Sequence, residues 1–287
     1  MQILIDNKSI DFTLEREKNS FEVITALSNW LNSSNMLISS ASVNDKEYYI
    51  NDKASLGKIS IEKIDKISIT TVTLKEFKFY QLILIQDFFK TLHHLVEGKN
   101  KTGIKEYLAE YSTIKPHLES VIDRAYNSQG GGFIESIAEK AEFSENDLID
   151  LRNFSDNIIF IAENRKKEII LTMEELAKEK AWFENFLPEL GNISVLMQTG
   201  KDSAAMEKII EFIDFSKKLS RLMSYYNIDT GKIDLESLSS YNKLLNELVE
   251  ALSRSDSVLT GDLLEYEIAP AIEQFFDIMS DDIMTDG

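Results

Sequence analysis

The first 75 residues alternate between hydrophobic and polar positions in a way that predicts strands around one helix. Met1–Ile5 opens with an apolar alternation, a turn-rich stretch follows, and alternation resumes from Ile10 to Leu14. Residues that alternate in this way form strands with one buried face. We therefore predict a hairpin at the start of the chain.

A helical period follows the predicted hairpin. Apolar residues recur every three or four positions from Phe21 to Leu31, and Asn19 and Ser20 precede them as candidate N-caps. Further alternation predicts strands in three places, namely around Val43, over Tyr48–Ile50 and over Ile67–Thr73. The order is thus two strands, a helix, and two or three more strands.

This order of elements resembles the β-grasp, or ubiquitin-like, fold. The features that carry the resemblance are the opening MQILID, the helix directly after the first hairpin, the Leu56-Gly57 turn and the closing strand KISITTV. Modifiers and carriers of this fold end in a free Gly-Gly, whereas this segment continues through Thr73-Leu74-Lys75 into helices. The resemblance therefore implies the other common use of the fold, a binding module.

From Glu76 onward the apolar positions follow the period of helices. No predicted helix is apolar on all sides, so each should cover one face of a shared core. We expect Pro116 in the first turn of a helix, and Pro188 with Gly191 to stop another. Glycine breaks at 200, 231 and 261 are about evenly spaced, as in a helical repeat array, but no residue signature recurs and the interval 131–199 is longer, which favours an irregular bundle.

The predicted fold class is α+β. A small β-grasp-like domain is expected over 1–76, followed by an all-α irregular helical bundle over 77–287. Internal breaks of the bundle are expected near 128–132 and 188–200, where glycine or proline interrupts the helical pattern.

The net charge of −18 over 287 residues is unevenly distributed. Residues 1–75 carry a net charge of −1, so 76–287 carry −17, and the last 33 residues contain nine acids and no base. Such a field repels phosphate, so we expect neither nucleic acid nor a membrane as a partner. It would attract a basic protein surface. The alternative is that the charge only keeps the protein in solution.

The composition also limits the chemistry. Absence of cysteine excludes disulfides, thiolate metal sites and a cysteine nucleophile. His93 and Glu97 could supply at most two metal ligands, and we predict no metal, no cofactor and no catalytic residue. The opening residues lack a signal-peptide pattern and no apolar run is long enough to span a bilayer, so we predict a cytoplasmic location.

The segment Asp262–Met279 is the candidate partner-binding site. It combines an aromatic pair with acidic residues, as an anchor for a basic, amphipathic partner helix would. The residues proposed to bind this partner are Asp262, Glu265, Tyr266, Glu273, Phe275 and Phe276. Pro270 should kink or split this helix. The alternative is that the helix simply completes the bundle.

The leading hypothesis is a non-catalytic protein-interaction module, such as an adaptor, scaffold or regulatory subunit. A first alternative is a cytosolic secretion or assembly chaperone, because acidic helical proteins with apolar stripes can hold exported helices. A second alternative is an enzyme with an unrecognised site between the sheet domain and the helical body.

Overall fold

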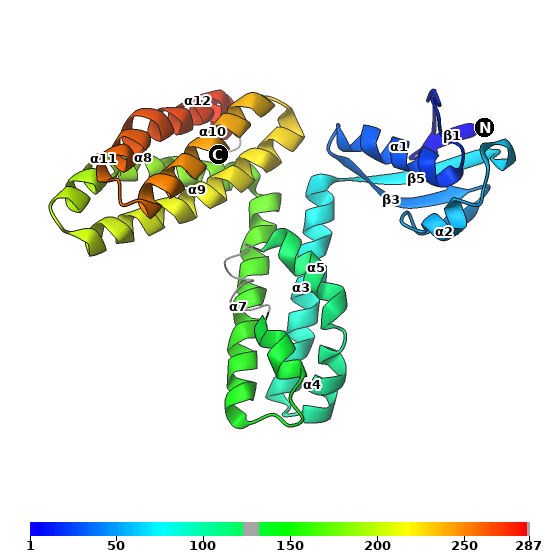
Figure 1. Ribbon diagram of the computed structural model, residues 1–287, viewed down its shortest axis with the longest axis horizontal. Coiled ribbons are helices and arrows are strands. Elements are labelled where there is room, and N and C mark those ends of the chain that lie inside the picture. Colours follow the sequence, from blue (N-terminus) through cyan, green and yellow to red (C-terminus); the bar gives the residue numbers. More distant parts are fainter. Residues whose placement is uncertain (123–131, 286–287) are drawn as a thin grey trace. The chain divides into compact units, whose positions relative to one another are not determined.

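A computed structural model describes residues 1–122 and 132–285 of the chain. The chain divides into two compact units, Met1–Glu163 and Asn164–Gly287, and the division falls inside helix α7 (Glu145–Ile170). An N-terminal mixed sheet precedes a helical region, which confirms the predicted α+β class (Figure 1). The change from strands to helices falls between Thr73 and Leu74.

The sheet contains five strands in the spatial order β2-β1-β5-β3-β4. The strands are β1 (Gln2–Ile5), β2 (Lys8–Ile10), β3 (Met36–Val43), β4 (Lys46–Tyr48) and β5 (Lys66–Thr73). β1 and β5 are parallel, and the other neighbouring strands are antiparallel. This is a β-grasp-like arrangement, in which the first and last strands meet at the centre of the sheet.

Helix α1 (Ser20–Asn32) supplies the apolar face that the sheet needs. Asn19 caps it by accepting a hydrogen bond from the Glu22 N–H, as the sequence predicted. Its buried residues belong to one core with inward-facing residues of the strands, including Ile67 and Ile69 of β5. Two short helical segments, α2 (Lys53–Leu56) and η1 (Ile61–Lys63), connect β4 to β5.

The helices of the first unit build a second core. They are α3 (Leu74–Glu97), α4 (Lys101–Leu108), α5 (Tyr111–Val121), the helical residues 132–138 and the first part of α7. α3 and α7 lie side by side and antiparallel: the rings of Phe89 and Phe154 are 5.7 Å apart, and His93 Nε2 lies 3.2 Å from Asp156 Oδ1 (Figure 1). Thr73 and Glu76 form a capping box that starts α3 directly after β5.

The second unit is a helical bundle around a third core. Its elements are α8 (Thr172–Gln198), α9 (Asp202–Thr230), α10 (Leu235–Ser253), α11 (Ser257–Asp262), the π-helical segment η2 (Leu263–Ile268) and α12 (Ala269–Thr285). Aromatic rings fill much of this core: Phe183 stacks on Phe215 and also contacts Phe276. Gly231 ends α9 with φ of 63°, a conformation that glycine adopts without strain.

Two expectations about proline are wrong. α8 does not stop at Pro188 but continues to Gln198, so no break occurs within 188–198. Pro188 lies on the exposed side of α8, where water can reach the carbonyl that loses its donor, while Phe186 and Leu190 remain in the core. Pro116 lies inside α5 instead of in its first turn, again at an exposed position.

Pro270 lies just after a π-helical segment, and the chain stays helical on both sides of it. The six residues before Ala269 form the wide π-helical turns of η2, which separate α11 from α12. A wider turn moves the preceding carbonyls away from the proline ring, so the chain continues as a helix despite the missing donor. The other expected break, near 128–132, falls mostly in 123–131, outside the described residues.

Candidate partner-binding surface

The six residues proposed from the sequence divide into two groups. Phe275 and Phe276 are only 4% and 3% exposed. The Phe275 ring meets Tyr241 edge-on at 5.6 Å, and the Phe276 ring lies 6.0 Å from that of Phe183. The aromatic pair thus completes the core of the bundle, because positions 272, 275, 276 and 279 share the buried side of α12.

The four polar residues are exposed: Asp262, Glu265, Tyr266 and Glu273. Three of them lie together, since the carboxylates of Glu265 and Asp262 both raise the pKa of Tyr266. Glu273 lies farther along, beyond Pro270. Three of the proposed residues therefore lie together on the surface, whereas the two aromatic anchors are buried.

Segment η2 and helix α11 lie directly against α8. A Cβ atom at Gly191 would be 3.7 Å from Glu265 Oε2, and one at Gly261 would be 2.5 Å from Ser194 Cβ. Because the helices approach closely at Gly261 and Ser194, the residues of α8 just after Ser194 lie beside the residues of α11 just before Asp262. The acidic segment is therefore continuous with the outer side of α8.

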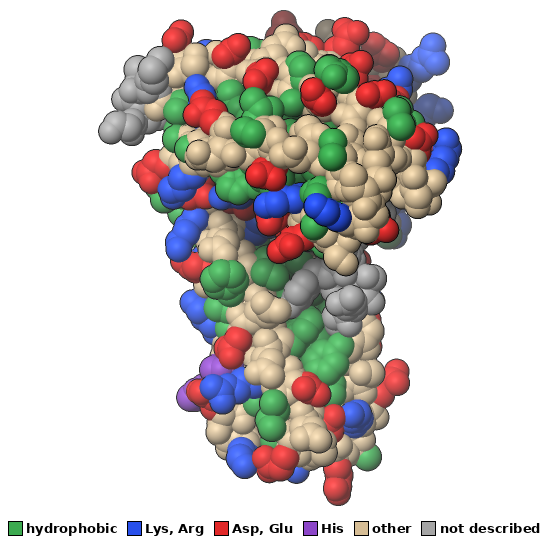
Figure 2. Space-filling model, turned by 90° about the vertical axis from the view of Figure 1, so that its left-hand side faces the viewer, with side chains coloured by type: hydrophobic (Ala, Val, Ile, Leu, Met, Phe, Trp, Pro, Cys, Tyr) green, Lys and Arg blue, Asp and Glu red, His purple; other side chains and the backbone are tan. Residues whose placement is uncertain are grey.

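Exposed apolar side chains gather at this end of the second unit. Five of them, each 41–60% exposed, come from three helices, and we call them the apolar end patch: Val195 of α8, Met206 and Ile210 of α9, and Val258 and Leu259 of α11. Figure 2 looks onto this end and shows hydrophobic side chains at the surface, separated by acidic ones. Exposed apolar groups that lie at one end of a helical bundle are candidates for an interaction site.

Two hollows lie at the apolar end patch, one among the ends of four helices and one on α9 alone. One, of about 440 Å³, lies among the ends of α8, α9, α10 and α11, lined by Met197, Met206, Leu252 and Ser257. The other, of about 560 Å³, follows the outer side of α9 past Met206, Glu207 and Ile210. Met206 lines both, so the two hollows form one uneven surface.

Carboxylates surround this surface. Asp202, Glu207 and Asp262 form no salt bridge with any residue that the structure describes, whereas Glu211 has Lys208 at 3.5 Å. Three cations, Lys201, Lys208 and Arg254, belong to the same end, and Arg254 is 3.1 Å from Glu250. The acids thus outnumber the bases, and several carboxylates are available to a cationic partner.

The sequence did not single out Met206 and Ile210 as surface residues. The buried stripe of α9 follows Ala205, Ile209 and Phe212. Met206 and Ile210 each lie one position after a buried residue, so they form a second, outer stripe on the same helix. That doubled stripe is the signal that could have revealed them.

Other chemistry finds little support in the described chain. His93 contacts Glu97 and Asp156, and His117 Nδ1 lies 3.1 Å from Gln81 Nε2. Among the described residues, no group of three or more His, Asp or Glu side chains is arranged to hold a metal ion. Within that same part of the chain, every helix is too short or too polar to cross a bilayer.

Comparison with known proteins gives two partial family matches. Residues 1–73, which end with the last residue of β5, match the family model of the TP0873 N-terminal domain. Residues 168–278, which span α8 to most of α12, match a domain of unknown function (DUF8042). No curated protein and no solved structure matches the chain. The apolar end patch therefore lies wholly within the second matched segment.

Proposed function

We propose that this protein is a non-catalytic interaction module, an adaptor or regulatory subunit, whose second unit binds a basic, amphipathic helix of a partner protein. The observation that carries the proposal is the apolar end patch, with its two hollows and its unpaired carboxylates. The occupant follows from the chemistry: apolar side chains would enter the hollows, and Lys or Arg side chains would reach the carboxylates at the rim.

The apolar part of the surface can contribute to binding. Fully burying an aliphatic side chain contributes about 1.5–3 kcal/mol, so covering five half-exposed side chains would contribute several kcal/mol before the costs of association. Met206 lies at the centre, because it lines both hollows. Residues at the centre of an interface usually contribute most of its energy.

The carboxylates select the charge of the partner. Asp202, Glu207 and Asp262 are exposed at the edges of the patch, where ionic strength screens them. Rim charges of this kind accelerate encounter with an oppositely charged partner and repel one of the same sign. An acidic amphipathic helix of the same apolar content should therefore bind weakly.

The proposal can be tested by titrating the full-length protein with synthetic 18-residue helices in a calorimeter. The first peptide contains leucine on one face and lysine on the other, the second replaces lysine by glutamate, and the third scrambles the first. We expect micromolar binding of the leucine–lysine helix only. Raising the salt concentration should weaken it.

Two variants locate the site. Met206→Asp should reduce the affinity for the leucine–lysine helix at least tenfold, because it places a charge between the two hollows. Leu235→Asp is the matched control: Leu235 is 78% exposed at the start of α10, outside the patch, and its substitution should leave the affinity unchanged. Equal binding by the scrambled peptide, or equal loss in both variants, would refute the proposal.

A further inference from the structure

The outer edge of the sheet is only partly covered. β3 pairs with β5 over its whole length, but β4 pairs only with Ala41, Ser42 and Val43 on the other side. Within the described chain, Met36–Ser40 therefore have no strand on the side away from β5. The unpaired N–H and C=O groups of an edge strand form hydrogen bonds readily with another extended chain.

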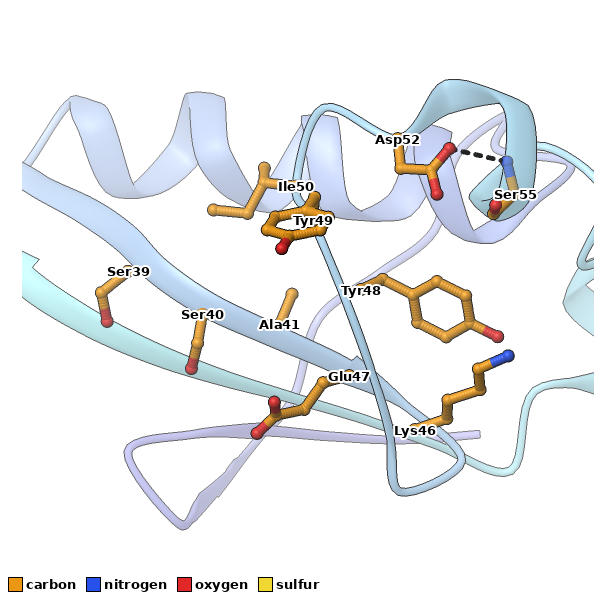
Figure 3. Close-up of a pocket in the computed structure, with 10 residues that line it drawn as sticks. All are labelled: Ser39, Ser40, Ala41, Lys46, Glu47, Tyr48, Tyr49, Ile50, Asp52 and Ser55. Atoms are coloured by element: carbon orange, nitrogen blue, oxygen red, sulfur yellow. Dashed lines mark hydrogen bonds between the residues drawn. The ribbon is translucent and has the colours of Figure 1, made fainter. Parts of the chain in front are cut away.

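A hollow lies beside this open edge. The chain leaves β3 after Tyr48, and a space of about 610 Å³ remains between the departing segment and β3. Figure 3 shows Tyr49 and Ile50 over this space, with Ser39 and Ser40 on the strand below them. Tyr49 is 88% exposed, an unusual position for a large aromatic side chain.

Three polar groups at the rim have partners within the domain, whereas Glu47 forms no hydrogen bond or ion pair with any residue that the structure describes. Lys46 Nζ lies 5.2 Å from the centre of the Tyr48 ring, and Asp52 accepts a hydrogen bond of 3.0 Å from the Ser55 N–H (Figure 3). Ser39 donates through its hydroxyl to the Thr70 carbonyl. What the site offers an incoming ligand is main chain, the apolar surfaces of Tyr49 and Ile50, and the exposed Glu47 carboxylate.

We infer that the open edge of β3 binds an extended segment of a partner protein, which adds to the sheet as a short sixth strand and places an apolar side chain against Tyr49 and Ile50. Five residues of free edge accommodate a strand of ordinary length. This site is independent of the apolar end patch, which lies in the second unit.

A second copy of the protein fits the edge less well. The register of β3 shifts between Ile38 and Ser40, which is a β-bulge. A bulge bends and twists its strand, so two such edges would not stay in register with each other. A single flexible peptide can follow the bend. The occupant is therefore a segment of another chain, and self-association is an outcome that the experiment must detect.

The test begins by selecting eight-residue peptides from a random phage-displayed library on the full-length protein. Synthetic copies of the selected peptides are then titrated into the protein and into its Tyr49→Ala variant. Because Tyr49 is almost fully exposed, its removal should not disturb folding, and it should weaken binding at least tenfold. Tyr80→Ala removes an exposed tyrosine of α3 instead and should have no effect.

Peptides carrying N-methyl groups on alternate residues show whether the main chain is recognised. Methylation of one alternate set should abolish binding, because those N–H groups face β3, and methylation of the other set should change the affinity less than twofold. Bound peptide should also slow hydrogen exchange of the amides within 36–40.

Several results would overturn the inference. It fails if no peptide is selected, if no selected peptide is sensitive to Tyr49→Ala, or if both methylated sets bind equally. Sedimentation equilibrium provides the last check. A dimer that Tyr49→Ala dissociates would assign the edge to a second copy of the protein instead.

Discussion

Arg221 of α9 holds Glu168, near the end of α7, through two parallel hydrogen bonds. Arg221 Nε is 2.8 Å from Glu168 Oε2, and Nη2 is 2.9 Å from Oε1. Arg165 approaches the same carboxylate at 3.3 Å, and Glu168 is only 5% exposed. A two-pronged pair of this kind fixes geometry as well as charge, so it sets how the last turns of α7 lie against α9 within the second unit.

Replacing Arg221 by methionine should destabilise the second unit. At pH 8 the Glu168 carboxylate would be left buried without its bidentate partner, and we expect the free energy of unfolding to fall by about 3 kcal/mol. Chemical denaturation followed by circular dichroism measures this. Arg152→Met is the control, since Arg152 lies on the surface 3.9 Å from Asp156 and should change stability by less than about 0.5 kcal/mol.

The same carboxylate should make stability depend on pH. Burial raises the pKa of Glu168 to about 7 from an ordinary value of 4.5, although Arg165 and Lys218 oppose the shift. Between these two values the folded protein binds a proton that the unfolded chain has lost. The contribution of Glu168 to stability is therefore complete below pH 4.5 and is lost as the pH rises through 7.

A comparison with Glu168→Gln isolates this contribution. Between pH 4.5 and pH 8 the parent protein should lose about 3 kcal/mol more stability than the variant, since each unit of pKa shift corresponds to about 1.4 kcal/mol. Denaturant titrations at both pH values supply the numbers. Parallel changes in the two proteins would show that Glu168 does not titrate in this range.

Tyr241→Phe should stabilise the protein. The Tyr241 hydroxyl is buried without a hydrogen-bond partner among the described residues, and burial raises its pKa to about 12. The nearby Ser216 hydroxyl lowers this pKa by acting as a hydrogen-bonding group, but the two hydroxyls do not meet in hydrogen-bonding geometry, and Ser216 also lacks a partner among the described residues. Removing an unsatisfied buried hydroxyl should raise the free energy of unfolding by about 1 kcal/mol, while the ring keeps its contact with Phe275.

Tyr226→Phe provides the opposite case in the same core. Tyr226 donates a hydrogen bond of 2.6 Å to Asp282 Oδ2, which Lys232 also contacts at 2.6 Å. Loss of this bond to a charged acceptor should lower stability by about 1.5–3 kcal/mol. Thermal unfolding of both variants beside the parent would show opposite shifts, and shifts of the same sign would contradict this prediction.

Two glycines on facing helices should respond in opposite directions to alanine. At Gly261 the added methyl would lie 2.5 Å from Ser194 Cβ, so α11 must move away from α8, and we expect a loss of about 1–3 kcal/mol. At Gly191 the nearest atom is 3.7 Å away, so alanine fits and should gain about 0.5–1 kcal/mol from helix propensity.

A double substitution tests whether the contact causes the loss at Gly261. Ser194→Gly removes the opposing atoms, so the combination with Gly261→Ala should be more stable than the sum of the two separate effects predicts. Additive effects would mean that the contact between Gly261 and Ser194 does not set how closely α8 and α11 approach each other.

The sequence predicted the class of the fold because the period of the apolar residues changes clearly at the end of β5. It missed the first half of β3, since Met36–Ser39 follow a run of serine and asparagine that looks like a loop. It also ended α8 too early, because proline was judged without knowing that position 188 faces solvent. Both errors arise because the local sequence does not show which side of β3 or of α8 packs against other elements.

The candidate surface was predicted only in part for the same reason. The acidic residues Asp262 and Glu265 beside Tyr266 could be read from the local sequence. The apolar end patch could not, because it assembles side chains from α8, α9 and α11 that lie up to 64 positions apart, from Val195 to Leu259. An apolar residue of an amphipathic helix is buried only where a partner helix covers it, and the local sequence does not show which positions are covered.

The wide turns of η2 have a consequence for comparing related sequences. A π-helical turn holds one more residue than the α-helical turn it replaces. If a relative has an ordinary α-helical turn here, it must lack one residue so that the buried positions of α12 still face the core. We therefore expect alignments of relatives to show a single-residue gap within 263–268, accompanied by the absence of a proline at position 270. Such a gap would show that a π-helical turn has been replaced by an α-helical turn while the rest of the helix is unchanged. In an alignment the gap therefore belongs inside the helix and not in a neighbouring loop.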